Sequence, residues 1–298
     1  MEPRRLTLTV PPQWEGQTVD VLLRQVLRLS GTSVKRAKAV PGGITLDGVP
    51  VFVSHRAPAG ARLSVVVGDT AADGSVVPVP GPLEIVFEDE DLLILNKAPG
   101  VPVHPGPGHQ DDTLGNFVAD YYKMTGQIAA FRPVHRLDRG SSGLLCVAKH
   151  AHAQEVLKGQ LHTAAFSRTY LAVCEGRPSP ERGVVDAPIG RAEGSAIKRE
   201  VRPDGAPART RYEVVEEAGG RSLLRLELET GRTHQIRVHM ARLGHPLTGD
   251  FLYGTEDPSL IARPALHAAE ISLVHPVTGR PHTWQAPLPE DMAALLQL

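Results

Sequence analysis

The stretch RSLLRLELETGRTHQIRVHMARLG, from Arg221 to Gly244, changes its hydrophobic period within a few residues. In its first part, Leu224, Leu226 and Leu228 alternate with charged side chains, which is the period of a strand with one buried face. In its second part, apolar residues recur from Ile236 at the spacing of one helical face. The stretch therefore predicts a strand that leads directly into a helix.

The chain on both sides of this stretch continues as short strands and helices without strict alternation. The segments are two strands within 83–97, a helix over 113–122 with Asp112 or Thr113 as its cap, a strand at 144–149, a helix over 151–161, a strand over 166–173, a hairpin within 265–287 and a short helix from about Glu290. Strands joined by tight turns favour antiparallel pairing. We therefore expect an α+β fold with a mixed, largely antiparallel sheet flanked by helices and loops.

The first 67 residues predict a small separate unit. An apolar stripe from Val19 predicts a helix. A second helix starts near Thr32 or Ser33, either of which can cap it, and carries Lys35, Arg36 and Lys38. The segment ITLDGVPV has an Asp-Gly pair between β-like arms, a strong hairpin signal. Residues 68–82 are rich in Gly, Pro and Ala and predict a linker, which leaves residues 83–298 for a larger catalytic domain.

Composition excludes several classes of protein. A net charge of −1 argues against a protein that coats nucleic acid indiscriminately, although basic residues cluster before residue 63. No uncharged apolar run approaches the roughly 18 residues of a membrane span, and no secretory segment is visible, so we expect a cytoplasmic protein. Cys146 and Cys174 each lie in an apolar stretch and predict buried, reduced thiols.

The segment HRLDRGSSGLL, from His135 to Leu145, places Asp138 between Arg136 and Arg139, just before a Gly/Ser turn. Nearby arginines favour the ionised form of a carboxylate, and an ionised carboxylate is a competent nucleophile. The alternative is a loop ion pair that fixes local geometry. The segment alone favours that structural alternative.

A second cationic cluster lies at the start of the helix predicted after Gly231. Arg232, His234 and Arg237 surround this helix start, with Thr233 as its possible cap, and a helix N-terminus with added cations favours a phosphate or carboxylate. Metal binding by His234, His239 and His245 is an alternative, but the spacing does not place two ligands on one helical face. Ordinary packed histidines are the third interpretation.

Taken together, these fragments resemble the RluA-type pseudouridine synthases. HRLDRGSSGLL is similar to the catalytic loop of that family, with Ser141 where Thr is usual, and GRTHQIRVHM matches a later family motif. NKAPG, VHPG, SRTYLAV, ALHA and HPVTGR follow in the family's order, so the resemblance covers roughly residues 83–290. The unit at residues 1–67 is similar to the RNA-binding module of small-subunit ribosomal protein S-four, except for Pro41 and Gly42.

The resemblance implies that the protein isomerises uridine to pseudouridine in structured RNA without a cofactor or metal. It makes Asp138 the nucleophile, which attacks either the ribose anomeric carbon or carbon 6 of uracil. It assigns Arg237 to pairing with that aspartate and Tyr170 to stacking on the base. It further implies that Arg136 fills the gap left by the flipped nucleotide and that Leu266 packs under the base.

The expected partner is RNA, with large-subunit ribosomal RNA or a ribosome assembly intermediate the favoured substrate. Arg232 and His234 are expected to bind substrate at the catalytic site, and Lys35 and Arg36 to bind RNA from the N-terminal module. We expect a monomer with no membrane partner. Two alternatives remain at this level: a non-catalytic RNA-binding or ribosome-assembly protein, and a histidine-dependent metallohydrolase.

Overall fold

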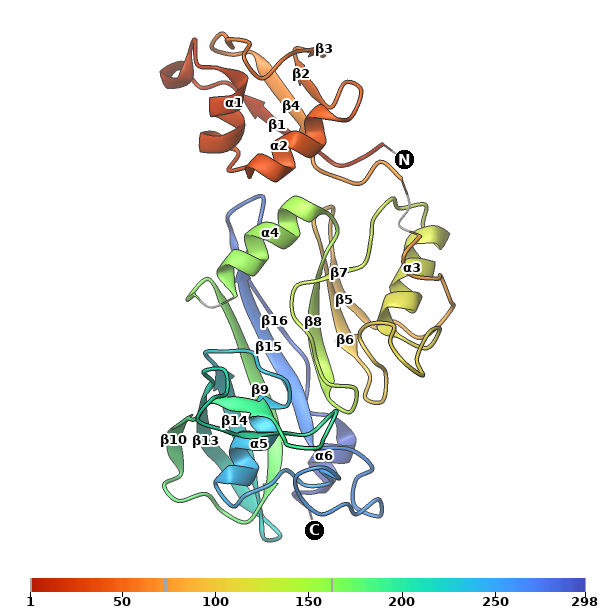
Figure 1. The fold of residues 1–298 in the computed structure, drawn as a ribbon, viewed down its shortest axis with the longest axis vertical. Helices are drawn as coiled ribbons and strands as arrows, with labels where there is room; N and C mark the ends of the chain where they lie inside the picture. The colour runs from red at the N-terminus through yellow and green to blue at the C-terminus, as the bar shows by residue number, and fades with distance from the viewer. Residues whose placement is uncertain (1, 72–73, 162, 298) are drawn as a thin grey trace.

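The computed structural model describes residues 2–71, 74–161 and 163–297 and contains two main sheets (Figure 1). The N-terminal sheet is antiparallel, in the order β1-β4-β2-β3. Its strands are β1 (Arg5–Thr9), β2 (Ile44–Leu46), β3 (Val49–Pro50) and β4 (Arg62–Val66). The hairpin at Asp47 and Gly48 is confirmed, and both residues have positive φ, 50° and 82°, as a tight two-residue hairpin turn requires.

The helices of this unit differ in detail from the predictions. The helix from Val19 is a short α-helix, α1 (Val19–Val21), that continues as a π-helical turn over Leu22–Val26. Helix α2 (Gly31–Lys38) is capped by Ser30, whose side chain accepts a hydrogen bond from the backbone N–H of Ser33 at 3.1 Å. The prediction of Thr32 or Ser33 as cap was therefore wrong, because both lie inside the helix.

The larger sheet runs in the order β10-β13-β14-β9-β15-β8-β6-β5, with β16 beside β15 and β7 beside β8. Its strands are β5 (Ile85–Glu88), β6 (Leu92–Lys97), β7 (Arg132–Pro133), β8 (Ser142–Ala148), β9 (Phe166–Glu175), β10 (Arg182–Asp186), β13 (Arg209–Ala218), β14 (Arg221–Leu228), β15 (Leu266–Val274) and β16 (Pro281–Gln285). Among these described strands, β15 and β8 pair in parallel and the other pairs are antiparallel. The α+β prediction is confirmed.

Helices and a small hairpin surround this sheet (Figure 1). They are α3 (Leu114–Met124), α4 (Ala151–Gln160), α5 (Gln235–Arg242), α6 (Glu290–Ala294) and the pair β11 (Ile189–Arg191) and β12 (Arg199–Val201). Of the two caps predicted for α3, Asp112 and Thr113, the second is correct, because Thr113 and Asn116 form a capping box. Among the described residues, no helix is both long enough and apolar enough to cross a membrane.

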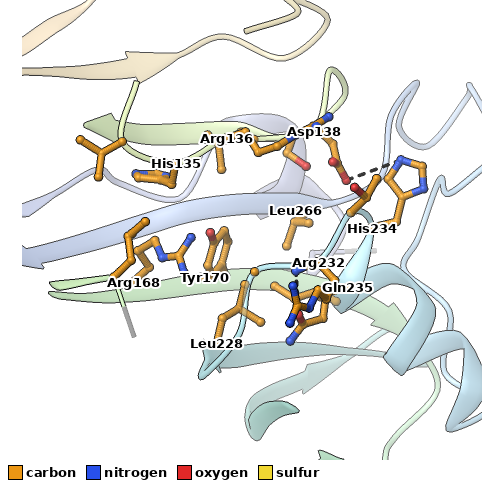
Figure 2. Close-up of a pocket in the computed structure, with 17 residues that line it drawn as sticks. His135, Arg136, Asp138, Arg168, Tyr170, Leu228, Arg232, His234, Gln235 and Leu266 are labelled. Carbon is orange, nitrogen blue, oxygen red and sulfur yellow. Dashed lines mark hydrogen bonds and ion pairs between the residues drawn. The ribbon is translucent and has the colours of Figure 1, made fainter. Parts of the chain in front are cut away.

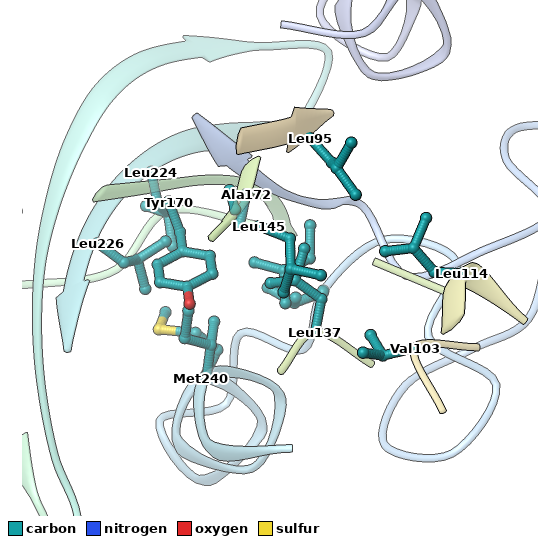
Figure 3. Packing of buried hydrophobic residues seen from close by; sticks show 14 of the residues in the cluster. Leu95, Val103, Leu114, Leu137, Leu145, Tyr170, Ala172, Leu224, Leu226 and Met240 are labelled. Atoms are coloured by element: carbon teal, nitrogen blue, oxygen red, sulfur yellow. The ribbon is translucent and has the colours of Figure 1, made fainter. Parts of the chain in front are cut away.

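The sheet is buried on both faces. Leu93 and Leu95 of β6 belong to one apolar cluster, whereas Leu92 and Ile94 belong to another, and successive side chains of a strand point to opposite faces. The two cysteines are free and buried, as predicted. Figure 3 shows the first cluster, in which β9, β14, the loop that carries Asp138 and α5 supply the side chains labelled Ala172, Leu226, Leu137 and Met240.

The start of α5 also differs from the prediction. His234, not Thr233, occupies the capping position, in a left-handed conformation with φ 59° and no side-chain capping bond. Gln235 shapes the turn instead: its side-chain oxygen Oε1 accepts hydrogen bonds from the backbone N–H of Arg232 and the hydroxyl of Thr230, both at 2.9 Å. The side-chain nitrogen Nε2 of Gln235 donates to the backbone carbonyl of Arg209, so the turn is anchored to β13.

The N-terminal unit is attached to the larger sheet by polar contacts. Arg4 donates to both carboxylate oxygens of Asp91, at 2.9 and 3.2 Å, and His150 lies 2.9 Å from the same carboxylate. Farther along, Asp69 makes two hydrogen bonds of 2.7 Å to Arg132. Asp89, Asp91 and His275 bring potential metal ligands within 4.8 Å of one another, but Arg4 and His150 already occupy the oxygens of Asp91, so we assign no metal there.

Replacing Asp91 with asparagine should destabilise the fold in a pH-dependent manner. Burial favours a higher pKa for Asp91, but the hydrogen bonds from His150 and Arg4 outweigh it and lower that pKa. A carboxylate with a depressed folded pKa contributes stability above its unfolded pKa, about 3.9, and loses it as pH falls toward the folded value. We expect a loss of about 2–3 kcal/mol at pH 7, less than a fully buried pair loses, because Arg4 is partly exposed.

The measurement is chemical unfolding of both proteins at pH 7 and pH 3. The difference between wild type and variant should be about 1 kcal/mol smaller at pH 3, as linkage requires for a group of unfolded pKa near 3.9. Asp20→Asn is the matched control, because Asp20 pairs with Arg24 on the surface and such pairs contribute about 0.2–1 kcal/mol. An equal difference at both pH values would contradict the role given to Asp91.

Candidate active site

A cavity of about 240 Å³ opens beside the loop that carries Asp138 (Figure 2). Its lining comes from the loop 134–141, Leu161 at the end of α4, strand β9, the end of β14, the turn into α5 with the first residues of that helix, and the start of β15. The lining side chains used below are Arg136, Leu137, Asp138, Ser141, Arg168, Tyr170, Leu228, Arg232, His234, Ile236 and Leu266. Residues that are far apart in the sequence thus meet at one site.

Asp138 stands at one end of this cavity, with 17% of its side chain exposed. Its carboxylate oxygen Oδ2 lies 3.6 Å from Nη1 of Arg237 and 3.9 Å from Nε2 of His234. Arg139 instead directs its guanidinium to His109, at 3.0 Å. The arginine nearest to Asp138 in space therefore comes from α5, about a hundred residues later in the chain, as the family resemblance predicted.

The backbone of the Asp138 loop is held from below. The carbonyl oxygen of Arg139 accepts hydrogen bonds from the backbone N–H of Gly100 at 2.8 Å and from Nζ of Lys97 at 3.2 Å. Lys97 is buried and also donates to the carbonyls of Ala98 and Val101. Burial lowers the pKa of Lys97 to about 7. The NKAPG segment thus fixes the loop that carries the carboxylate.

The principal partner of Arg237 is Asp250, a residue that the sequence interpretation did not identify. Arg237 Nε and Nη2 each donate to Asp250 at 2.7 Å, and Asp250 is fully buried. The aspartate also accepts from the backbone N–H groups of Leu252 and Tyr253. The rings of Phe251 and Tyr253 lie 5.6 and 5.1 Å from Cζ of Arg237. Two of the three guanidinium nitrogens are therefore committed, and Nη1 is left facing Asp138.

The three histidines considered as possible metal ligands do not converge on a common point. His234 lies 2.8 Å from the hydroxyl of Tyr253, His239 contacts Thr210 at 2.8 Å, and His245 contacts the backbone of Glu175 at 2.9 Å. Burial lowers the pKa of His234, and the charge of Arg237 adds to this while Asp138 opposes it. A neutral His234 therefore forms no ion pair with the Asp138 carboxylate, which stays available to a substrate. These contacts support the packed-histidine interpretation over the metal site.

The floor of the cavity is apolar. Tyr170 and Leu266 are buried on neighbouring strands, β9 and β15, and Leu228 and Ile236 line the same cavity. Burial raises the pKa of Tyr170, and the charge of nearby Arg168 partly opposes this change, so the phenol keeps its proton at neutral pH. An apolar slot with a carboxylate at one end can hold a flat heterocycle next to a nucleophile.

The remaining predicted binding residues fall into two groups. Arg136 and Arg232 are exposed at the rim of the cavity, and Arg232 Nε donates to the carbonyl of Pro207 at 3.0 Å. Lys35 and Arg36 lie on α2 of the N-terminal unit and do not line this cavity. Arg36 lines a separate cleft that also includes Arg132. The structure therefore brings the catalytic candidates together but keeps the two α2 cations apart from them.

Comparison with known proteins identifies the family. Residues 91–242 match the family model described as RNA pseudouridylate synthase. A ribosomal large subunit pseudouridine synthase D of Nitrosomonas europaea is 40% identical over 300 residues, covering 98% of this chain and 87% of that protein. The chain belongs to the RluA-type RNA pseudouridine synthases.

Other relatives agree with this assignment. The ribosomal large subunit pseudouridine synthase D of Escherichia coli K12 is 35% identical to this synthase over 307 residues, covering 99% of this chain and 94% of that protein. The solved structure of human RNA Pseudouridylate Synthase Domain Containing 1 superposes with a TM-score of 0.58 at 29% identity, covering 72% of this chain and 89% of that one. The synthase is therefore an isomerase that converts uridine to pseudouridine in RNA.

Proposed function

We propose that this synthase converts specific uridines of large-subunit ribosomal RNA to pseudouridine. The observation that carries the proposal is the position of Asp138 at one end of an apolar slot, 3.6 Å from Arg237. The names of the Nitrosomonas europaea and Escherichia coli relatives support the choice of ribosomal RNA. The partner in this proposal is RNA, either mature or within a ribosome assembly intermediate. The synthase acts in the cytoplasm as a monomer.

In the proposed mechanism, Asp138 is the nucleophile and attacks either the anomeric carbon of the ribose or carbon 6 of uracil. The base lies in the slot between Tyr170 and Leu266, turns there and rejoins the ribose through carbon 5. Arg237 keeps the carboxylate ionised and oriented. A paired or stacked uridine must first leave its stack, at a cost of a few kcal/mol, and Arg136, Arg232 and His234 at the rim offset this cost through contacts with the RNA.

We further propose that residues 1–67 form an RNA-binding module, that residues 68–82 connect it, and that residues 83–298 form the catalytic domain. An apolar cluster of its own, containing Val19, Leu23 and Leu63, supports the first assignment. Lys35 and Arg36 are exposed on α2 and supply the phosphate contacts of the module. Recognition through phosphates rather than bases suits RNA that is read by shape.

Mapping pseudouridine in the total RNA of cells with and without this synthase tests the proposed substrate. We expect at least one position in large-subunit ribosomal RNA to lose pseudouridine when the gene is absent and to regain it with the wild-type gene. Complementation with Asp138→Asn is the control and should not restore it. A change confined to transfer RNA would overturn the ribosomal assignment, and unchanged modification of every RNA would favour the binding-only alternative.

Replacing Lys35 and Arg36 with glutamine should weaken RNA binding without slowing the chemical step. Each lost phosphate contact reduces the slope of log affinity against log salt by about 0.7–0.9, so two contacts should reduce it by about 1.4–1.8. Binding titrations at several salt concentrations and rates at saturating RNA measure the two effects. Arg24→Gln is the matched control, because Arg24 lies on the same unit and already pairs with Asp20. An unchanged slope would remove these residues from the RNA contact.

A further inference from the structure

Arg168 is a buried cation in the catalytic cavity that the mechanism above does not use. It lies on β9 two residues before Tyr170, so both side chains point to the same face of the sheet. Only 7% of Arg168 is exposed, and its guanidinium lines the cavity. Figure 2 places Arg168 at the end of the cavity away from Asp138, with Tyr170 and Leu266 between them.

No carboxylate pairs with this guanidinium among the residues that the structure describes. The ion pairs at the cavity join Asp138 to His234 and Arg237, at the opposite end. A buried cation without an anion costs several kcal/mol. A second cation, Arg232, is close in the chain, because it follows Gly231, which lies against the Arg168 guanidinium. The site therefore contains uncompensated positive charge where the apolar slot ends.

Arg168 has the hydroxyl of Tyr170 as a hydrogen-bond partner, whereas a second polar group of the cavity has none among the described residues. Ser141 is 2% exposed, and among the described residues its hydroxyl oxygen has no hydrogen-bond partner. Buried polar groups are nearly always hydrogen-bonded, so a group that occupies the cavity, whether water or a ligand, is expected to bind this hydroxyl. The cavity thus offers a guanidinium and a hydroxyl, both donors, to whatever occupies it.

We propose that Arg168 donates hydrogen bonds to a carbonyl oxygen of the target uracil and stabilises the negative charge that develops on the base during isomerisation. The inference rests on the proposed role of the cavity as the uridine site. A base whose sugar-bearing edge faces Asp138 extends along the slot past Tyr170 and Leu266. Its carbonyl edge then lies toward Arg168, while Ser141 lies in the turn directly after Asp138.

Both possible routes place negative charge on the uracil oxygens. If Asp138 attacks the anomeric carbon, the new carbon–oxygen bond forms as the bond to nitrogen 1 breaks, and the electron pair left on nitrogen 1 delocalises onto the two carbonyl oxygens. If Asp138 adds to carbon 6, the π electrons of the 5,6 double bond move toward the carbonyl at position 4. A preorganised cation at these oxygens stabilises either species. On the first route, the bond that forms from carbon 5 to the sugar displaces Asp138, which leaves with its electron pair. On the second route, the bond from nitrogen 1 to the sugar breaks with its electron pair on nitrogen 1, carbon 5 then bonds to the anomeric carbon, and loss of Asp138 from carbon 6 restores the 5,6 double bond. On both routes carbon 5 loses its proton and nitrogen 1 gains one.

The test compares Arg168→Met and Arg168→Lys with the wild type in single-turnover assays. The substrate is a transcript containing a uridine that the wild type converts, whichever RNA the mapping identifies, so a wrong ribosomal assignment does not affect this test. We expect Arg168→Met to lower the rate about 10²–10³-fold, the range for losing one donor to a developing oxyanion. RNA affinity should change less than threefold, and Arg168→Lys should recover about tenfold of the lost rate. Arg225→Met, on the exposed side of β14, should remain within twofold.

Substrates with altered atoms identify what Arg168 contacts. Transcripts with 2-thiouridine or 4-thiouridine at the target position replace one carbonyl oxygen with sulfur, a weaker acceptor. With the wild type, at least one of these transcripts should react about tenfold more slowly than the uridine transcript. With Arg168→Met, the same transcript should react at nearly the rate of the uridine transcript. The proposal is overturned if Arg168→Met keeps its rate, if its whole loss lies in affinity, or if neither thio substitution couples to it. Coupling instead to a methylphosphonate beside the target would assign Arg168 to a phosphate and overturn the carbonyl contact.

Discussion

Replacing Asp138 with asparagine is expected to reduce pseudouridine formation by at least about 10⁴-fold, as loss of a covalent nucleophile does in other enzymes. Asparagine has the same size and keeps the loop contacts made by the backbone of Asp138, such as the hydrogen bond from the N–H of Ser141 to its carbonyl oxygen. What disappears is the negative charge and the nucleophilic oxygen. RNA affinity should therefore stay within about threefold, because binding depends mainly on phosphate contacts made elsewhere.

Single-turnover formation of pseudouridine and equilibrium RNA binding measure the two quantities on one preparation. Asp20→Asn is the matched control, since Asp20 is a surface carboxylate of the N-terminal unit that pairs with Arg24. Its variant should keep its rate within twofold. Substantial turnover by Asp138→Asn would rule out the nucleophile role.

The second large effect concerns Arg237 and Asp250. Arg237→Met should destabilise the fold by about 3–5 kcal/mol, because it leaves the fully buried Asp250 without its cationic partner. It should also slow the reaction about 10²–10³-fold, since one charge that orients Asp138 is gone. Measured alone, this variant confuses unfolding with loss of catalysis.

The double variant Arg237→Met with Asp250→Asn separates the two effects. It removes both buried charges together, so most of the lost stability should return. Activity should not return, because no guanidinium faces Asp138. Thermal unfolding and single-turnover rates of the wild type, both single variants and the double variant complete the cycle. Recovery of activity together with stability would show that Arg237 serves the fold and not the reaction.

The sequence could predict the fold class and most elements because their signals are local. The alternation at Leu224 and Leu226 and the Asp-Gly pair at Asp47 each act over a few residues, and the structure confirms both. The cap of α5 could not be predicted in this way. Its turn depends on Gln235 binding to β13, a contact that exists only after the sheet has formed.

The candidate site shows the same division. Asp138, Tyr170 and Arg237 lie in motifs with recognisable residue types, but Asp250 is a single acid in the apolar segment HPLTGDFLYG. That isolation was the available signal, because an acid among apolar residues is usually paired when buried. Its partner could not be named from spacing, since two of the three guanidinium nitrogens of Arg237 turn toward Asp250 only in the folded chain.

Hydrogen bonds at two positions hold the segment between the two sheets. Asp69 binds Arg132, and the carbonyl of Val77 accepts a hydrogen bond from Asn116 of α3. A free glycine-rich tether of this length would let the N-terminal unit sample a wide volume and would supply only an effective local concentration of its binding surface. The described parts of the connector around Asp69 and Val77 have already lost that conformational freedom during folding. An RNA that touches both parts of the protein is therefore spared the entropy of ordering a tether when it binds.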